Sequence, residues 1–363
     1  MSTVGVESHS EQGMAQRKAQ HLEICLRKEK YQVEGGATGF NDVSFYHRAL
    51  PEIDANQIDL TTSFLGRTLQ APLFISSMTG GSAEGYRLNK ILAQAAGLRG
   101  IPIGMGSMRI LFRKKEVFEH FALRKLAGDS PILSNIGAVQ IRDMKHSDLY
   151  EMNRKLEVDA QIIHLNPGQE LFQPEGDRDF SKIFSSIERF IEKSPLPVIV
   201  KETGCGISPH EAKALLKAGA AYVDVAGIGG TNWITVESYR QTDPNEAEPF
   251  RNWGHPTAAL LGALGHKKGR ILASGGLRSG LDLAKSLALG AHLGGFALPL
   301  IRSAETGGLE GVLSTLDLFI VQLRQVMTLT GCLKPSILRK VPLQVTSDLA
   351  QGIDFLKYPR RRF

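Results

Sequence analysis

The sequence predicts an α/β protein, a (β/α)8 TIM barrel that carries an N-terminal cap segment. From residue 71 onward, short apolar runs alternate with helical patterns at intervals of about 30 residues. Eight such units fit within about 260 residues, which matches the strand number and the size of this fold. No G-x-G-x-x-G motif follows the first apolar run, so a doubly wound nucleotide-binding sheet is the weaker alternative.

Composition limits the classes of function. The 363 residues carry 43 basic and 37 acidic side chains, and the only dense basic cluster is Arg360–Arg362. This balance favours a small anionic substrate and argues against a nucleic-acid partner. Three cysteines without CxxC spacing (Cys25, Cys205, Cys332) indicate neither a disulfide framework nor a zinc site, and fit the cytoplasm. No run of 18 apolar residues and no secretory leader occurs, so we expect no membrane span.

The chain divides into four expected segments. Residues 1–16 are a polar leader that we expect to be disordered. Residues 17–70 form the cap and substrate segment, which opens with an amphipathic helix over Arg17–Leu26 and continues through short strands or an irregular cap. Residues 71–340 form the barrel, and residues 341–363 form a C-terminal tail.

The barrel elements are expected in strict alternation. The predicted strands are Ala71–Met78, Ile101–Ser107, Ile132–Gly137, Gln161–Asn166, Val198–Thr203, Tyr222–Gly227, Ile271–Gly275 and His292–Leu298. The predicted helices are Leu88–Leu98, Glu116–Ala127, Ser147–Leu156, Phe180–Lys193, Pro209–Ala218, Thr257–Leu264, Leu281–Leu289 and Val312–Thr330. The long connection Gly229–His255 after the sixth strand is a candidate lid.

Polar side chains end strand after strand, where the site of this fold lies. No nucleophile–base pair stands among them, which favours binding of a polar cofactor over hydrolysis. Lys201 ends a buried apolar run and could neutralise negative charge on a ligand, although a solvated Lys201–Glu202 pair is an equal alternative. These strand-end residues are Ser77, Met78, Ser107, Met108, Arg109, Asn135, His164, Asn166, Lys201 and Ser274.

Two loops suggest specific ligands. The segment Ala273–Gly280 follows strand seven, where its glycines would let backbone amides approach a phosphate; a tight turn that merely needs glycine is the alternative. Glu170 follows strand four and could ligate Mg²⁺ beside a diphosphate, or simply lie in the first turn of a helix. His21 and Cys205 are interpreted as packing residues.

From Arg17 to about Thr330 the chain resembles the type 2 isopentenyl diphosphate isomerases, the FMN-dependent form of that enzyme. The resemblance rests on an ordered set of motifs: Arg17-Lys18…His21, Met78-Thr79-Gly80-Gly81, Gly106-Ser107-Met108-Arg109, His164–Glu170, Lys201–Gly204, Gly229-Gly230-Thr231 and Gly275–Arg278. It departs from the family at Gln20, where an acidic residue is common, and at Met108, where glutamine is usual.

The resemblance implies roles for particular residues. FMN contacts would fall on Ser77, Met78, Thr79, Ser107, Asn135, Lys201, Thr231, Gly276, Leu277, Arg278, Ala297 and Leu298. Substrate contacts would fall on Arg17, Lys18, Ser107, Met108, Arg109, His164, Asn166 and Gln169. Gln169, Lys201 and His164 would serve catalysis, and Glu170 would hold Mg²⁺. The resemblance also implies NADPH as the reductant of the flavin and a homo-oligomer, a tetramer or an octamer.

The implied reaction converts isopentenyl diphosphate to dimethylallyl diphosphate, with reduced flavin as the acid–base group. An FMN-dependent 2-hydroxy-acid oxidase is a rival, but it needs a His and an Arg after strand six, where Ala226–Asn232 has neither. An inosine-monophosphate-dehydrogenase-like enzyme would need a cysteine in that same loop, and Cys205 follows strand five instead. A non-enzymatic phosphate-binding barrel is the remaining alternative.

Overall fold

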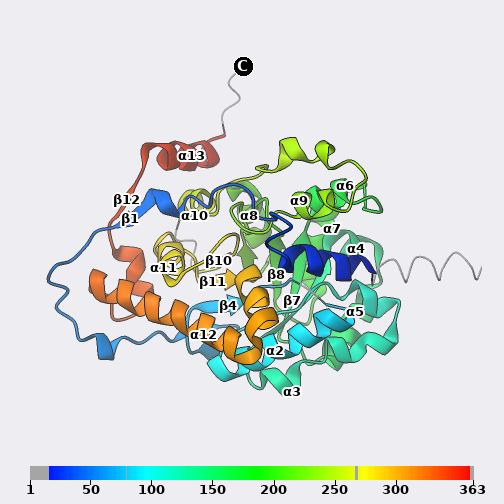
Figure 1. Cartoon of the computed structure of the whole chain (residues 1–363), viewed down its shortest axis with the longest axis horizontal. Coiled ribbons are helices and arrows are strands. Elements are labelled where there is room, and N and C mark those ends of the chain that lie inside the picture. Colours follow the sequence, from blue (N-terminus) through cyan, green and yellow to red (C-terminus); the bar gives the residue numbers. More distant parts are fainter. Residues whose placement is uncertain (1–15, 79, 266–268, 360–363) are drawn as a thin grey trace, which may run out of the picture.

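A computed structural model describes residues 16–78, 80–265 and 269–359 of the chain. Its centre is a closed barrel of eight parallel strands in the order β10-β11-β4-β5-β6-β7-β8-β9, which confirms the predicted fold (Figure 1). The strands are β4 (Leu73–Ile75), β5 (Ile103–Gly104), β6 (Ile132–Gly137), β7 (Ala160–Leu165), β8 (Val198–Glu202), β9 (Tyr222–Asp224), β10 (Ile271–Ala273) and β11 (Leu293–Phe296). Each coincides with one predicted run.

The register between strands decides which side chains meet at the carboxyl ends. Strand β7 pairs in parallel with β8, and His164 lies opposite Lys201. On its other side β7 pairs with β6, and His164 lies opposite Gly137. Because Gly137 has no side chain, the His164 ring has room at this edge, where an added Cβ would come within 3.2 Å of Nε2.

Helices surround the barrel and follow the strands as predicted. They are α2 (Ala83–Arg99), α3 (Arg124–Ala127), α4 (Ala138–Asp143), α5 (His146–Lys155), α6 (Pro167–Phe172), α7 (Ile183–Lys193), α8 (Pro209–Lys217), α9 (Trp233–Ser238), α10 (Thr257–Leu264), α11 (Gly280–Ala288) and α12 (Leu298–Thr330). The helix predicted over Glu116–Ala127 is instead a 3-10 helix, Lys115–His120, followed by the short α3. The fully buried Phe121 lies at this break, where the chain turns inward.

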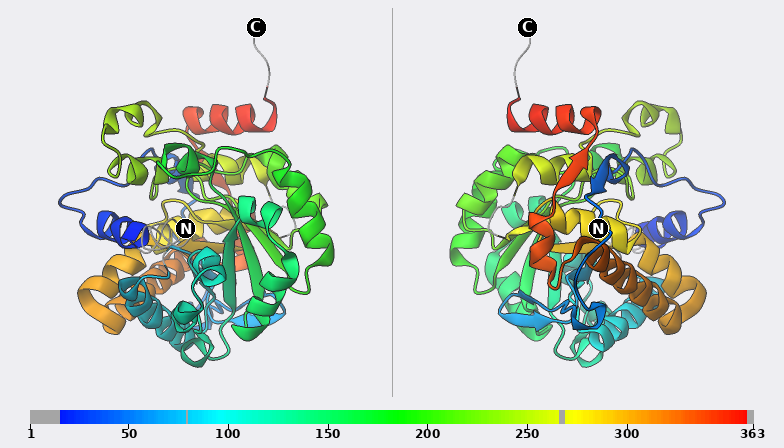
Figure 2. Two further views of the ribbon diagram at one scale, coloured as in Figure 1. Left: turned by 90° about the vertical axis from the view of Figure 1, so that its right-hand side faces the viewer. Right: turned by 90° about the vertical axis from the view of Figure 1, so that its left-hand side faces the viewer.

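The segment before the barrel covers both of its ends. Residues 16–26 are helical and lie at the carboxyl ends of the strands. Strands β2 (Thr62–Phe64) and β3 (Arg67–Leu69) form an antiparallel hairpin, light blue at the lower edge of Figure 2. Phe64 and Leu69 of this hairpin are buried against Phe74, Leu133 and Leu272 of the barrel interior, so the hairpin plugs the opposite end.

Residues 341–359 also belong to the folded body. Residues 341–363, expected as a tail, contain β12 (Leu343–Val345) and α13 (Ser347–Lys357). Strand β12 pairs antiparallel with β1 (Val43–Phe45), and α13 lies near α10 in Figure 1. In the contact between the two helices, an added Cβ at Gly262 would collide with Ile353. The leader expected over residues 1–16 and the basic cluster Arg360–Arg362 lie almost entirely outside the described residues.

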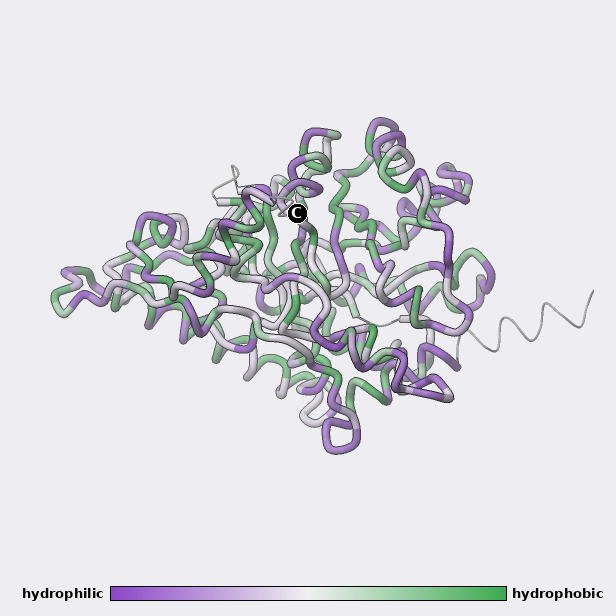
Figure 3. The backbone as a smooth tube through the Cα atoms, turned by 90° about the horizontal axis from the view of Figure 1, so that it is seen from above, coloured by the Kyte–Doolittle hydropathy of each residue, from purple (hydrophilic) through white to green (hydrophobic). Residues whose placement is uncertain are grey.

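Hydrophobic segments concentrate in the interior, and the outer loops are more hydrophilic (Figure 3). Helix α12 is long and apolar enough to cross a membrane by length and composition alone, a test that helices packed in a protein core also pass. It packs on α2 and α11, bends at Gly308, and carries Asp317, whose carboxylate pairs with Arg99 at 2.6 Å. These contacts identify it as an outer helix of the barrel.

Candidate active site

Two connected cavities open at the carboxyl ends of the strands. The inner cavity lies under the loops after β9, β10 and β11 and is lined by Ser76, Ser77, Met78, Lys201, Thr203, Gly204, Ala226, Gly230, Thr231, Trp233, Ser274, Gly275, Gly276, Arg278, Gly295, Ala297 and Leu298. The outer cavity is lined by Arg17, Lys18, His21, Leu22, Cys25, Ser77, Met78, Gly80, Ser107, Arg109, Asn135, Gln140, His164, Asn166, Gln169, Glu170, Gln173, Lys201, Thr203 and Trp233. The outer cavity encloses about 1060 Å³ including its open mouth, and both cavities share Lys201.

The inner cavity has the backbone of a phosphate cradle. Gly275 and Gly276 have positive φ angles of 101° and 83°, which favour glycine. A Cβ on Gly276 would lie 2.3 Å from the Thr38 methyl carbon and 2.5 Å from the Gly229 carbonyl, so the loops approach more closely than any side chain permits. The hydroxyl of Ser77 is buried without a hydrogen-bond partner among the described residues, and it lines this cavity. A bound polar ligand would satisfy it.

Lys201 lies where the two cavities meet. Its side chain is 6% exposed, and Nζ donates to the carbonyl of Glu202 at 2.5 Å. Glu202 does not pair with the ammonium through its carboxylate, which instead accepts from the backbone amides of Gly204 and Gly206 at 2.5 and 3.0 Å. The solvated Lys201–Glu202 pair is therefore excluded, and the ammonium lies at a buried strand end in the lining of both cavities.

Cations dominate the outer cavity. Lys18 Nζ donates to the carbonyl of Ser107 at 2.9 Å and lies 5.7 Å from the centre of the Phe121 ring. Burial, and then the neighbouring Arg17, lower the pKa of Lys18 to about 7. A cation whose pKa is lowered in this way regains its charge when an anion binds beside it. Arg17 and Lys18 reach this cavity within their own chain.

The tautomer of His164 follows from its partner. The amide nitrogen of Asn135 donates to the Met105 carbonyl at 3.1 Å, so the Asn135 oxygen faces the His164 ring. His164 Nδ1 lies 2.8 Å from that oxygen and must carry the hydrogen, which leaves Nε2 as the acceptor of the neutral ring. Burial, followed by the charges of Lys201, Lys18 and Arg109, lowers the pKa of His164 to about 3. The ring is neutral until an anion enters.

Glu170 presents one buried carboxylate to the outer cavity. One oxygen accepts from Asn166 Nδ2 at 3.0 Å, and the other accepts from the Asp177 amide at 2.8 Å. Within the described residues, no group of three or more His, Cys, Asp or Glu could hold a metal ion. Mg²⁺ fits this arrangement only in the way it usually binds, through one carboxylate together with waters and substrate phosphates.

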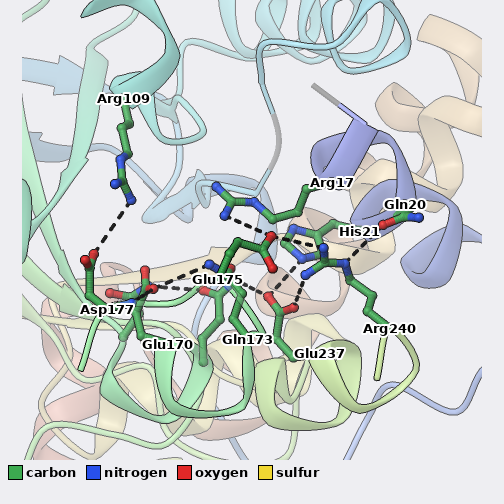
Figure 4. A network of polar contacts seen from close by, with 12 residues as sticks. Arg17, Gln20, His21, Arg109, Glu170, Gln173, Glu175, Asp177, Glu237 and Arg240 are labelled. Atoms are coloured by element: carbon green, nitrogen blue, oxygen red, sulfur yellow. Dashed lines mark hydrogen bonds and ion pairs between the residues drawn. The ribbon is translucent and has the colours of Figure 1, made fainter. Parts of the chain in front are cut away.

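A polar network that the sequence did not reveal holds the outer cavity in shape (Figure 4). Glu237 of α9 is fully buried, and its carboxylate lies 2.9 Å from His21 Nε2, accepts from Gln169 Nε2 at 2.9 Å, and pairs with Arg240 at 2.5 Å. Burial raises the pKa of Glu237, but His21, Gln169 and Arg240 more than offset this and leave it lowered. Only the position of Glu237 in the long connection Gly229–His255 could have drawn attention to it.

Most predicted site residues come together on these cavities, but two do not. Met108 is fully buried among apolar side chains, so it does not reach the substrate cavity. The Leu277 side chain is likewise buried in the core, and its carbonyl accepts from Arg278 Nη1 at 2.7 Å. Thr79 lies outside the described residues. His21, interpreted as a packing residue, lines the outer cavity, whereas burial and then the charge of Glu202 raise the pKa of the Cys205 thiol to about 12.

A barrel with a glycine cradle, a buried lysine and a cationic mouth defines a class of protein that binds phosphorylated ligands. Residues 18–116 and 143–343 match the family described as FMN-dependent dehydrogenase. The fold is shared with the lactate oxidase of Pediococcus acidilactici (TM-score 0.65, 20% identity, covering 92% of this chain and 94% of that one). It is also shared with a soluble mutant of (S)-mandelate dehydrogenase from Pseudomonas putida (TM-score 0.62, 18% identity, covering 91% and 98%).

Curated relatives specify the family further. The chain is 42% identical to the isopentenyl-diphosphate delta-isomerase of Borrelia garinii, over 96% of this chain and 98% of the relative. It is 41% identical to the protein of the same name from Pyrococcus abyssi, with the same coverage. The chain therefore belongs to the FMN-dependent isopentenyl-diphosphate delta-isomerase family. The inner cavity fits FMN by three of its own features: the glycine cradle, the unpartnered Ser77 hydroxyl and the buried Lys201 ammonium.

Proposed function

We propose that this protein converts isopentenyl diphosphate to dimethylallyl diphosphate. The observation that carries the proposal is the meeting of two anion-binding regions at Lys201. The inner cavity offers a phosphate cradle at Gly276, and the outer cavity gathers Arg17, Lys18 and Arg109. A phosphorylated cofactor and a diphosphate substrate would then lie against each other, as a reaction between them requires.

The diphosphate would bind in the outer cavity. Arg17 and Lys18 approach from the N-terminal helix, and Ser107 and Arg109 follow β5. His164, near the end of β7, and Asn166, directly after β7, would complete the substrate contacts. Because His164 is neutral in the free site, an arriving diphosphate would favour its protonation and strengthen the contact.

Proton transfer requires no carboxylate or thiol pair from the chain. Reduced FMN would supply the acid–base chemistry that adds one proton at the terminal alkene carbon and removes another from the allylic position. Lys201 would stabilise the negative charge of the ring, since its ammonium is buried and has one carbonyl partner. Gln169 would hold the alkene in place, with its amide fixed by Glu237 at 2.9 Å and by Asn166 at 3.3 Å.

Two further requirements belong to the proposal. NADPH would reduce the flavin once to prime the protein, with no net oxidation or reduction per turnover. Glu170 would hold Mg²⁺ through a lone pair that its hydrogen bonds from Asn166, Gln173 and Asp177 leave free, and the metal would offset the diphosphate charge. The rival 2-hydroxy-acid oxidase activity lacks this support, because the loop Ala226–Asn232 offers no His or Arg to the inner cavity.

We also expect a cytoplasmic homo-oligomer that binds neither nucleic acid nor membranes. The three cysteines are free, which is consistent with a reducing compartment. On α12, Leu318, Val321 and Leu329 are each about half exposed and lie on one helix face, which would suit a contact with a second copy. Light scattering of the wild-type protein and of Leu318→Glu would test this contact, and an unchanged mass would reject it.

One experiment tests the activity. The purified protein is mixed in heavy water with FMN, Mg²⁺, NADPH and isopentenyl diphosphate. The product is then identified by liquid chromatography coupled to mass spectrometry. We expect dimethylallyl diphosphate that carries deuterium, and consumption of no more than one NADPH per flavin. Turnover with oxidised flavin and no reductant would contradict the proposed chemistry, and the absence of product would contradict the proposed substrate.

A further inference from the structure

A continuous set of polar contacts joins the phosphate loop to the N-terminal helix. Arg278, in the loop after β10, donates from Nε to Glu34 Oε1 at 2.9 Å. The other oxygen of Glu34 accepts from Arg302 Nη1 at 3.4 Å. Arg302 lies in the first turns of α12 and donates from Nε to the Cys25 carbonyl at 3.1 Å. Because Cys25 lies near the end of helical residues 16–26, these contacts connect two functional regions.

The segment that carries Glu34 is attached to the rim of the inner cavity on both sides. Asn232 donates its backbone amide to the Val33 carbonyl at 2.8 Å, and Gly229 donates to the Gly35 carbonyl at 3.0 Å. Cys25 and Val33 share one apolar cluster with Leu298 at the start of α12. The segment is therefore a rigid link rather than a loose connection between the helix and the cradle.

Glu34 contacts Arg278 from outside the inner cavity and so does not occupy the space of a ligand. Arg278 lines the inner cavity, whereas Glu34 does not. Its ion pairs use one edge of the Arg278 guanidinium, and the five donors of this group leave others for a phosphate. Burial raises the pKa of Glu34, but Arg278 and then Arg302 more than offset this and leave it lowered, so the carboxylate is charged at neutral pH.

We propose that Glu34 is a positioning residue that, with Arg302, latches the helix carrying Arg17 and Lys18 to the loaded phosphate cradle. A phosphate held by Arg278 would fix the Arg278 side chain, and Arg278 would in turn hold Glu34 in place. Glu34 would then hold Arg302, which bonds the end of the helix at Cys25. Binding of the cofactor then strengthens binding of the diphosphate, and the reverse holds by linkage. The proposal rests on the proposed function, which places the FMN phosphate at Gly276 and the diphosphate at Lys18.

The test measures this coupling without turnover. The affinity for inorganic pyrophosphate is determined by calorimetry, with and without saturating FMN, for the wild-type protein, for Glu34→Gln and for Glu23→Gln. Glu23 is the matched control, since it lies on the same segment and its ion pair among the described residues is with the exposed Arg27 at 3.5 Å. We expect FMN to tighten pyrophosphate binding about tenfold in the wild-type protein and in Glu23→Gln, and less than about threefold in Glu34→Gln.

A second variant, Arg302→Lys, tests the proposal if Glu34→Gln does not fold. Arg302→Lys keeps the charge but cannot bond both Glu34 and the Cys25 carbonyl through a guanidinium, so the same loss of coupling is expected. Wild-type coupling in both variants would overturn the latch, and so would a wild-type protein that binds FMN and pyrophosphate independently. A wild-type protein that binds no FMN would instead overturn the proposed function itself.

Discussion

Replacing Lys18 by methionine should weaken pyrophosphate binding strongly at pH 6 and hardly at all at pH 9. In the free protein Lys18 Nζ has the Ser107 carbonyl at 2.9 Å as its hydrogen-bond partner, so its remaining donors are available to an anion. A hydrogen bond to a charged group contributes about 1.5–3 kcal/mol. If the charged Lys18 contributes about 2.7 kcal/mol of binding free energy, it tightens pyrophosphate binding about 100-fold, because about 1.4 kcal/mol corresponds to a factor of ten.

The pH dependence follows from the lowered pKa of about 7, which burial and then Arg17 produce. Above that pH the free lysine is neutral, and the bound anion must draw a proton back to it. Each further pH unit costs about 1.4 kcal/mol of binding. The advantage of lysine over methionine should therefore fall to about tenfold at pH 8 and disappear near pH 9.

The assay is calorimetric titration of the FMN-loaded protein with pyrophosphate at pH 6, 7, 8 and 9. The ratio of the two dissociation constants is the informative quantity, because ionisation of pyrophosphate itself cancels. Arg27→Met is the control, since Arg27 directly follows the helix that carries Lys18, has a side chain 59% exposed, and should show a ratio near one throughout. A Lys18→Met ratio that stays constant from pH 6 to pH 9 would refute the reasoning.

Three further predictions concern other parts of the molecule. Lys201→Met should lower turnover at least about tenfold and slow flavin reduction by NADPH, because a buried charge expected beside the flavin ring is lost. Stopped-flow rates equal to those of the wild-type protein would reject this role. Phe64→Ala should lower the free energy of unfolding by about 3–5 kcal/mol, because it leaves a cavity at the base of the barrel. The melting temperature should fall by several degrees. Tyr46→Ala is the control and should change it little, since Tyr46 is 66% exposed. Cys205 should resist iodoacetamide at pH 7.5, because burial and Glu202 raise the pKa of its thiol, and rapid labelling of the native protein would contradict that burial.

The sequence predicted the elements that repeat and missed those that depend on distant partners. The apolar run before Lys201 and the glycines around Gly276 follow from local patterns, and both face the same end of the barrel. The contact between His21 and Glu237 joins residues more than 200 positions apart, and neither has a local signal for it. The same holds for β12, whose three residues acquire a partner only when β1 lies beside them. The family resemblance assigned Met108 to the substrate, yet its side chain is buried in the core.

The hairpin at the far end of the barrel leaves the near end for ligands. With Phe64 and Leu69 filling the base, both cavities lie at the opposite end of the barrel, and Arg17 and Lys18 line the outer one. The two cavities share Ser77, Met78 and Lys201 in their lining, so a diphosphate bound in one would lie against a flavin bound in the other. Exchange of the cofactor should therefore stall whenever substrate is abundant, and the protein would keep one flavin through many catalytic cycles.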